Sequence, residues 1–160
     1  MTPQNSAPRA LPMGELAVAR SEGVLRTLLG SCIGVALYDR RLKVAGLGHI
    51  VLPASLGRTD TPGKFADTAV PALIEKMQGL ATGERLRLDA RIAGGANMFY
   101  SESENTVGRQ NQQAVERLLA ELRIEIRGKH CGGEQGRRMT FDVATGAVRI
   151  DIVGAETISL

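Results

Sequence analysis

Two consecutive apolar stretches joined by a short polar turn constrain the fold of this chain most strongly. Residues 33–38, Ile-Gly-Val-Ala-Leu-Tyr, alternate larger and smaller apolar side chains, which is typical of a strand buried on both faces. The polar run at 39–43 has the length of a turn, and residues 44–52 then predict a second strand. The two strands are therefore expected to pair side by side in an antiparallel sheet.

A potential nucleophile and a potential base lie in these two strands. Cys32 follows a Gly-Ser step at the start of the first strand, and His49 lies inside the second. Antiparallel pairing can bring the two side chains together, and a thiol needs a nearby base to become a nucleophile. The alternative is that both are ordinary core residues, since free cysteine is among the most often buried residue types. The residue types alone leave both interpretations open.

Motifs along most of the chain together resemble the CheD family, the chemoreceptor glutamine deamidases of chemotaxis. They are Leu29-Gly-Ser-Cys32, His49 with Leu52-Pro53, Gly63 to Ala69, Ile92 to Phe99, Val107-Gly108 with Asn111, and Gly132-Gly133 with Arg137. In order and spacing they cover about residues 14 to 150. A Gly-Ser-Cys step alone is common, but this many motifs in register are specific.

The resemblance implies an enzyme, a cysteine amidohydrolase of the protein-glutamine glutaminase type. It would deamidate specific glutamine side chains of chemoreceptors to glutamate and release ammonia, with Cys32 as nucleophile and His49 as general base and acid. The family's third catalytic residue is a threonine six positions before the cysteine, where this chain has Arg26. Thr27 is the expected replacement. Because a shift of one residue in a strand reverses the face of a side chain, a bulge or an altered loop must restore Thr27, or another group orients His49.

Gly30, Ser31 and Asn97 are the expected substrate-binding residues. Backbone N–H groups around the Gly-Ser-Cys step can hold an oxyanion. Asn97 ends a glycine turn that lacks the Lys-Ser or Lys-Thr of a Walker loop, so close backbone packing near the site is expected there.

No metal or other cofactor is expected. A zinc site from Cys32, His49, His130 and Cys131 would need two ligands from adjacent residues, which fits a tetrahedral site poorly. Asp39 and Asp67 are further candidates to orient a histidine. Their simpler interpretations are that Asp39 closes a strand and that Asp67 faces water from a helix.

The length of 160 residues predicts one domain. Residues 1–12 hold three prolines and are expected to form a disordered tail, followed by a single deamidase-like domain over 13–160. The N-terminus lacks the apolar core of a signal peptide, and no apolar run has the length of a membrane helix, so a cytoplasmic protein with reduced thiols is expected. The net charge of +3 is scattered and aromatic residues are few, which argues against nucleic-acid binding.

The remaining patterns predict about eight strands and two helices in all, a mixed α/β domain in which strands dominate. These elements are strands at 15–20 and 24–29 joined by a hairpin-like turn, a helix at 64–80 interrupted by Pro71, a strand at 86–93 with one wet face, a helix to 122 capped by Thr106, a short strand at 124–127, a loop at 128–138, and a hairpin of 139–143 with 147–153. The resemblance implies a layered β-sheet sandwich with two outer helices, as in CheD and, more distantly, the cytotoxic necrotizing factor catalytic domain.

Two functional classes remain. The first is the deamidase, whose substrate would be the cytoplasmic helices of chemoreceptors, reached in a shallow groove with Cys32 at its floor and the loops 53–63 and 95–106 as rims. The second is a non-catalytic regulatory module that docks chemoreceptors or a CheC-type phosphatase. The Cys32–His49 spacing favours the first, and Arg26 at the position of the family threonine keeps the second open. The protein is expected to act as a monomer.

Overall fold

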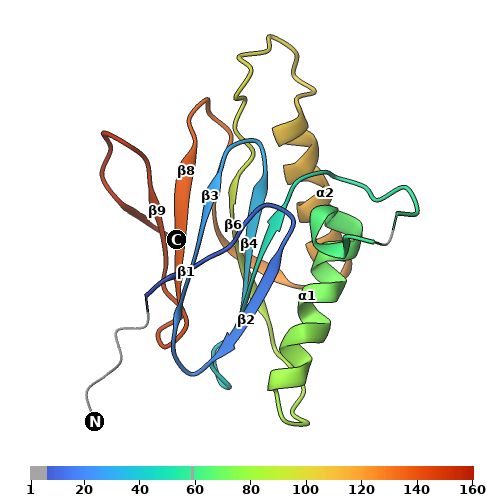
Figure 1. Ribbon diagram of the computed structural model, residues 1–160, viewed down its shortest axis with the longest axis vertical. Helices are drawn as coiled ribbons and strands as arrows, with labels where there is room; N and C mark the ends of the chain where they lie inside the picture. The colour runs from blue at the N-terminus through green and yellow to red at the C-terminus, as the bar shows by residue number, and fades with distance from the viewer. Residues whose placement is uncertain (1–6, 59) are drawn as a thin grey trace.

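The computed structural model describes residues 7–58 and 60–160, which form a mixed α/β domain of two sheets and two α-helices (Figure 1). The first sheet contains, in spatial order, β1 (Arg9–Ala10), β3 (Val24–Leu29), β8 (Arg137–Asp142), β9 (Val148–Asp151) and β10 (Ile158–Ser159). The second contains β2 (Leu16–Arg20), β5 (Val44–Ile50), β4 (Ile33–Asp39), β6 (Asp89–Gly94) and β7 (Glu125–Cys131). The helices are α1 (Ala66–Leu80), preceded by the short 3-10 turn Pro62–Lys64, and α2 (Val107–Glu121).

The second sheet is the middle layer of the domain. One apolar cluster fills the space between the two sheets and includes Leu29, Tyr38 and Phe141. Another packs the opposite face of the second sheet against α1 and α2 and includes Val35 and Leu73. All seven residues of β4 are buried, which explains why this strand is apolar at both of its alternating positions.

The predicted pairing of the Cys32 and His49 strands is confirmed. β4 and β5 are antiparallel, joined by the turn after Asp39, and Gly34 lies directly opposite His49. Gly34 also sets the spacing of the two sheets, because a Cβ atom there would lie 2.7 Å from the sulfur of Met139 on β8. The glycine therefore lets the first sheet approach the strand that follows Cys32.

Both predicted helices are present. Thr106 caps α2, with its side chain accepting a hydrogen bond from the Arg109 N–H, as the sequence indicated. The first helix begins at Ala66, and Pro71 lies inside it in the second turn. The last predicted hairpin is also present, as β8 paired with β9.

The expected hairpin of 15–20 with 24–29 is wrong. β2 pairs with β5 and β3 pairs with β8, so the link at 21–23 carries the chain from one sheet to the other. Ser21 in this link has a positive φ of 71°. Turn length is a local property, whereas the choice of pairing partner depends on strands far away in the sequence.

The strand at 86–93 with one wet face is also corrected. β6 begins at Asp89 and lies between β4 and β7, and Arg91, expected to face water, is only 8% exposed. Its guanidinium pairs with the Asp89 carboxylate at 3.0 Å and donates to the carbonyl of Leu160, so burial does not leave the charge unpaired. Residues 128–131, expected in a loop, extend β7 along β6.

The structure differs from the expectation of a disordered tail through residue 12. Arg9 and Ala10 form β1, parallel to β3, and Leu11 is buried in the core between the sheets. Residues 1–6 of that expected tail lie outside the described residues. Within the described part of the chain, no helix combines the length and apolar character that crossing a membrane requires.

Candidate active site

Cys32 lies in a three-residue turn, Gly30–Cys32, that carries the chain from β3 in the first sheet to β4 in the second. We call these residues the nucleophile turn. The Cys32 side chain is 6% exposed and belongs to the core between the sheets. The carbonyl of Cys32 accepts a hydrogen bond from the Gly95 N–H at 2.9 Å, and that of Gly30 accepts one from the Ala96 N–H at 3.0 Å. Backbone contacts thus fix the turn on both sides of the thiol.

The glycine turn at 94–95 provides the close backbone packing expected from the sequence. A Cβ atom on Gly94 would lie 2.1 Å from the carbonyl oxygen of Cys32, and the φ of Gly94 is +108°. Both the space and the backbone angle therefore require glycine beside the nucleophile turn.

His49 lies on the same face of the second sheet as Cys32. Gly34 is paired with His49, and Cys32 precedes Gly34 by two residues. Side chains two positions apart in a strand share a face, and Cys32 directly precedes β4, so its side chain is directed to the same side of the second sheet as that of His49. The imidazole is 2% exposed. The register thus directs the thiol and the imidazole to the same side of the second sheet, into the space between the sheets.

Thr27 orients the imidazole. Its Oγ1 donates to the carbonyl of Leu11 at 2.7 Å and lies 2.6 Å from Nδ1 of His49. A hydroxyl has one hydrogen and a carbonyl can only accept, so the Leu11 contact uses that hydrogen. Nδ1 of His49 must then carry a hydrogen and donate it to Thr27. Nε2 is left with a free lone pair, and it is buried with no hydrogen-bond partner in the described part of the chain.

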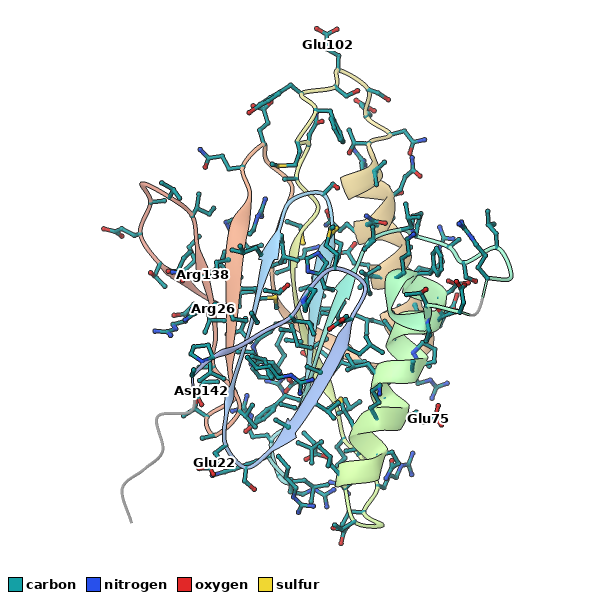
Figure 2. The ribbon with its side chains drawn as sticks, viewed as in Figure 1. Glu22, Arg26, Glu75, Glu102, Arg138 and Asp142 are labelled. Atoms are coloured by element: carbon teal, nitrogen blue, oxygen red, sulfur yellow. The ribbon has the colours of Figure 1, made fainter. Side chains whose placement is uncertain are left out.

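The regular geometry of β3 explains why Thr27, and not Arg26, contacts His49. β3 pairs with β8 in continuous register from Val24 to Leu29. Thr27 is buried between the sheets, whereas Arg26 projects from the opposite face, near Arg138 of β8 (Figure 2). The strand therefore needs no bulge to bring a threonine to the histidine.

The N-terminal segment contributes groups that the sequence analysis missed. Besides the Leu11 carbonyl, the His49 carbonyl accepts from the Gly14 N–H at 2.8 Å, and the His49 N–H donates to the Glu15 carbonyl at 3.2 Å. Leu11 is the single large apolar side chain in residues 7–12, which is the one signal in the sequence that this segment is anchored.

Burial keeps both reactive groups in their neutral forms. Desolvation raises the pKa of the Cys32 thiol and lowers the pKa of His49 to about 4. At neutral pH the two groups are thus a thiol and an unprotonated imidazole on the same side of the second sheet. This arrangement can transfer a proton from sulfur to Nε2 when an electrophile arrives, without a standing ion pair.

The three expected substrate-binding residues lie in different settings. Gly30 and Ser31 are in the nucleophile turn itself. Asn97 follows the 94–95 turn, but its side chain is engaged in its own loop: Nδ2 donates to the Ser101 carbonyl at 2.6 Å and Oδ1 accepts from the Ser101 N–H at 3.0 Å. The amide therefore shapes the loop, and the structure gives no free amide at this position.

The other candidate residues do not contact His49. Asp39 accepts from the N–H groups of Leu42 and Arg87 and closes the turn after β4, as expected. Asp67 does more than face water, since it accepts from both the N–H and the hydroxyl of Ser55.

Cys131 and His130 end β7, away from His49. Burial raises the pKa of the Cys131 thiol to about 11, so this thiol is protonated at neutral pH. Nδ1 of His130 lies 2.9 Å from one guanidinium nitrogen of Arg137, and that nitrogen also donates to the His130 carbonyl. The other terminal guanidinium nitrogen donates to the Gly132 carbonyl. Over residues 7–58 and 60–160 there is no cluster of three or more side chains suited to hold a metal ion.

The fold and this site define a class: a two-sheet α/β protein that directs a buried thiol and an imidazole with a fixed tautomer into the space between its sheets. Residues 51–152 match the family model described as CheD chemotactic sensory transduction, a span that begins two residues after His49. A "probable chemoreceptor glutamine deamidase CheD" of Clostridium botulinum strain Alaska E43 is 45% identical over 92% of this chain and 94% of its own. The "chemoreceptor glutamine deamidase CheD" of Thermotoga maritima is 40% identical over 91% and 92%. This chain belongs to the CheD family.

Proposed function

We propose that this protein is a chemoreceptor glutamine deamidase, an amidohydrolase that converts specific glutamine side chains of chemoreceptors to glutamate and releases ammonia. The observation that carries the proposal is the Thr27–His49 hydrogen bond, which leaves a free Nε2 lone pair in the region that Cys32 shares. The names of the relatives supply the substrate class. A cytoplasmic location and action as a monomer are part of the same proposal.

The proposed first half of the reaction forms a thioester. Nε2 of His49 takes the proton of the Cys32 thiol as the sulfur attacks the carbon of the glutamine carboxamide. The resulting oxyanion collapses, the C–N bond breaks, and His49 returns the proton to the departing nitrogen, which leaves as ammonia.

The second half regenerates the thiol. Nε2 removes a proton from a water molecule, whose oxygen attacks the thioester carbon. The C–S bond then breaks, the sulfur recovers a proton from His49, and the glutamate side chain is released. Throughout, Thr27 accepts from Nδ1–H and keeps the imidazole in the tautomer that both halves need.

The nucleophile turn is a candidate oxyanion site because its peptide planes are held in place. The carbonyls of all three residues accept hydrogen bonds: Gly30 from the Ala96 N–H, Ser31 from the Asn111 amide, and Cys32 from the Gly95 N–H. N–H groups fixed in this way can meet a developing negative charge without reorganising.

An apolar surface beside the turn suits a helical protein substrate. A groove of about 550 Å³ is lined by Leu28, Gly30, Met98 and Val153 among others. Phe99 and Tyr100 on the adjoining loop are 84% and 69% exposed, whereas the chain's three other aromatic side chains are buried. Figure 2 shows Glu102 at the tip of this loop, which projects beyond the sheets. The loop can therefore serve as one rim of a groove for a receptor helix, whereas none of the described residues of the 53–63 loop lines this groove.

Incubation with receptor cytoplasmic fragments tests the proposal. Mass spectrometry of the fragments should detect carboxamides converted to carboxylates by the wild-type protein and by Cys131→Ser. The variant Cys32→Ala should be inactive and remain folded, with a cooperative thermal transition. Activity that survives Cys32→Ala but is lost in Cys131→Ser would show that the site has been assigned to the wrong thiol.

A second candidate is a non-catalytic module that docks chemoreceptors or a CheC-type phosphatase. The low exposure and raised pKa of the Cys32 thiol favour it, since both slow covalent chemistry. Under this alternative Cys32→Ala would complement a deletion strain fully, whereas under the deamidase proposal it would not.

A further inference from the structure

Asn111 is a polar residue with no exposed surface, and the chemistry described above does not assign it a role in bringing Cys32 and His49 together. It lies in the second turn of α2, on the side of the second sheet that faces the helices. Its Nδ2 atom donates to two carbonyl oxygens at once, that of Ser31 at 3.1 Å and that of Val51 at 2.9 Å.

These two carbonyls lie just beyond the end of the β4–β5 ladder, whose last pair is Ile33 with Ile50. Two acceptors cannot bond to each other, so they need a bridging group with two hydrogens. The amide nitrogen of asparagine has two. A hydroxyl has one and a carboxylate has none, so few side chains of this size can replace it.

We propose that Asn111 is a positioning residue for the deamidation reaction, which clamps the turn carrying Cys32 to the strand carrying His49. The inference rests on the proposed function. Ser31 directly precedes Cys32, and Val51 follows His49 by two residues. The clamp therefore fixes the distance between these two segments of the chain, as the proton transfer requires. It also holds the Ser31–Cys32 peptide, whose N–H is a candidate oxyanion donor.

The start of α2 is held against the same turn. A Cβ atom on Gly108 would lie 2.4 Å from the carbonyl oxygen of Gly95 and 2.8 Å from that of Ala96, so the helix touches this segment backbone to backbone. The N–H groups of those two residues bond the nucleophile turn. Asn111 lies one turn further along α2. This backbone contact therefore fixes its position relative to Cys32 independently of its own hydrogen bonds.

The unpaired oxygen of the Asn111 amide indicates that the NH₂ donors, rather than packing, explain why an asparagine occupies this position. Oδ1 of Asn111 is buried and has no hydrogen-bond partner within the residues that the structure describes. An unpaired buried acceptor destabilises the folded state. Its presence is explained if the NH₂ group of the same side chain is needed.

The test compares Asn111→Asp, which keeps the size but loses the donors, with Val115→Ala. Val115 is equally buried and lies one turn further along α2, so its truncation loosens the helix without touching the clamp. All variants carry Cys131→Ser, which leaves Cys32 as the single thiol. Three quantities are measured: kcat and KM on a receptor fragment, the melting temperature, and the rate of Cys32 alkylation by iodoacetamide at neutral pH relative to alkaline pH, with His49→Ala as reference.

Asn111→Asp should lower kcat roughly 10- to 100-fold with little change in KM. Its alkylation at neutral pH should fall to the level of His49→Ala, because the base no longer reaches the thiol. Val115→Ala should lower the melting temperature and leave kcat and the alkylation ratio unchanged. If Asn111→Asp does not fold, the smaller Asn111→Ser takes its place in the same comparison.

The inference is overturned if the Asn111 variants keep the wild-type kcat and alkylation ratio. It is also overturned if Val115→Ala, at the same loss of melting temperature as Asn111→Asp, lowers kcat by as much. It is also overturned if alkylation of the wild type does not depend on His49, since there is then no pair to position. A wild-type protein that deamidates no receptor fragment, yet loses His49-dependent alkylation on Asn111→Asp, refutes the proposed function and leaves the clamp standing.

Discussion

Thr27 has one hydroxyl hydrogen, and the Leu11 carbonyl receives it. The state of His49 follows from this contact, because a threonine oxygen that has donated its hydrogen can only accept from Nδ1–H. Unlike a carboxylate, the neutral hydroxyl cannot balance a full imidazolium charge. An imidazolium at His49 is therefore a short-lived species, in line with the lowered pKa of this residue.

Replacing Thr27 by valine keeps the shape of the side chain and removes its oxygen. We expect Thr27→Val to lower kcat by about 10²-fold or more, because His49 can then adopt the tautomer in which Nε2 carries the hydrogen. The buried Leu11 carbonyl also loses its donor, at a cost of about 1–3 kcal/mol in the free energy of unfolding. Steady-state kinetics and denaturant unfolding measure the two effects. Thr27→Ser should keep both the wild-type kcat and the wild-type free energy of unfolding. A fully active valine variant would remove Thr27 from the mechanism.

The pH dependence of activity should show the lowered pKa of His49. Burial moves this pKa from 6.5 to about 4, so the imidazole stays an unprotonated base as the pH falls through 6 and 5. We expect the acid limb of kcat/KM for receptor fragments to lie near pH 4. An acid limb near 6.5 would mean that the imidazole is solvated in the working enzyme.

The same pKa affects stability with a defined sign. Because the folded-state pKa lies below the unfolded one, the contribution to stability is complete above pH 6.5 and is lost as the pH falls towards 4. The variant His49→Gln should lose less unfolding free energy than the wild type over that interval.

At the scale of elements, the site is built where three segments meet: the link from β3 to β4, the end of β5, and the segment from β1 to β2. The last of these supplies the Leu11 carbonyl and two backbone hydrogen bonds to His49. A part of the chain that composition predicts to be disordered thus orients the candidate base.

Deleting residues 1–12 should therefore lower kcat, because Thr27 is freed from Leu11 and can donate its hydrogen to Nδ1 of His49. The melting temperature should also fall, since Leu11 leaves the core between the sheets. A deletion of residues 1–6 keeps every one of these contacts and serves as the matched control. Equal activity of the two deletions would contradict the role given to this segment.

Glycine at 94 is required by the nucleophile turn. A Cβ atom there would collide with the Cys32 carbonyl, and φ is +108°, so Gly94→Ala should lower the free energy of unfolding by at least about 2 kcal/mol. Gly79 in α1 is the control, because a Cβ atom there meets nothing within 4 Å and the helix favours alanine by roughly 0.5–1 kcal/mol. Denaturant titrations should give effects of opposite sign. A neutral Gly94→Ala would mean that the turn can move.

At the scale of the whole molecule, the site is suited to a large substrate. Cys32 is largely covered, and the apolar groove beside Gly30 adjoins a loop that carries exposed aromatic side chains. A free amino acid can use few of these contacts, whereas a helix can cover many of them and be held in place for attack.

We therefore expect negligible turnover of free glutamine and measurable deamidation of an intact receptor helix. Phe99→Ser should raise KM more than it lowers kcat, because the change removes a binding contact remote from the reacting atoms. Glu75→Ser on α1 is the control, because Glu75 is exposed on the helix layer and lies outside the groove lining (Figure 2). Ammonia release from free glutamine at the rate seen with receptor fragments would point instead to a small-molecule amidase.

Much of the fold could be predicted because the signals are local. The double-faced apolar run at 33–38 identified the central strand, its polar turn identified the partner strand, and the Thr106 cap with its following periodicity identified α2. The errors occur where pairing is decided at long range. The link at 21–23 has the length of a hairpin turn, yet its two strands join different sheets.

The sequence by itself determined that the strand following Cys32 pairs with the strand carrying His49, because strand period and turn length fix such a register locally. Tertiary structure decided which threonine orients the histidine, since only the packing of β3 across the sandwich turns Thr27 inward and Arg26 outward. It also decided that the Leu11 carbonyl and the Asn111 amide support the site. Both contacts join residues 16 to 80 positions apart, and their formation depends on how the layers pack, which no local pattern of residues encodes.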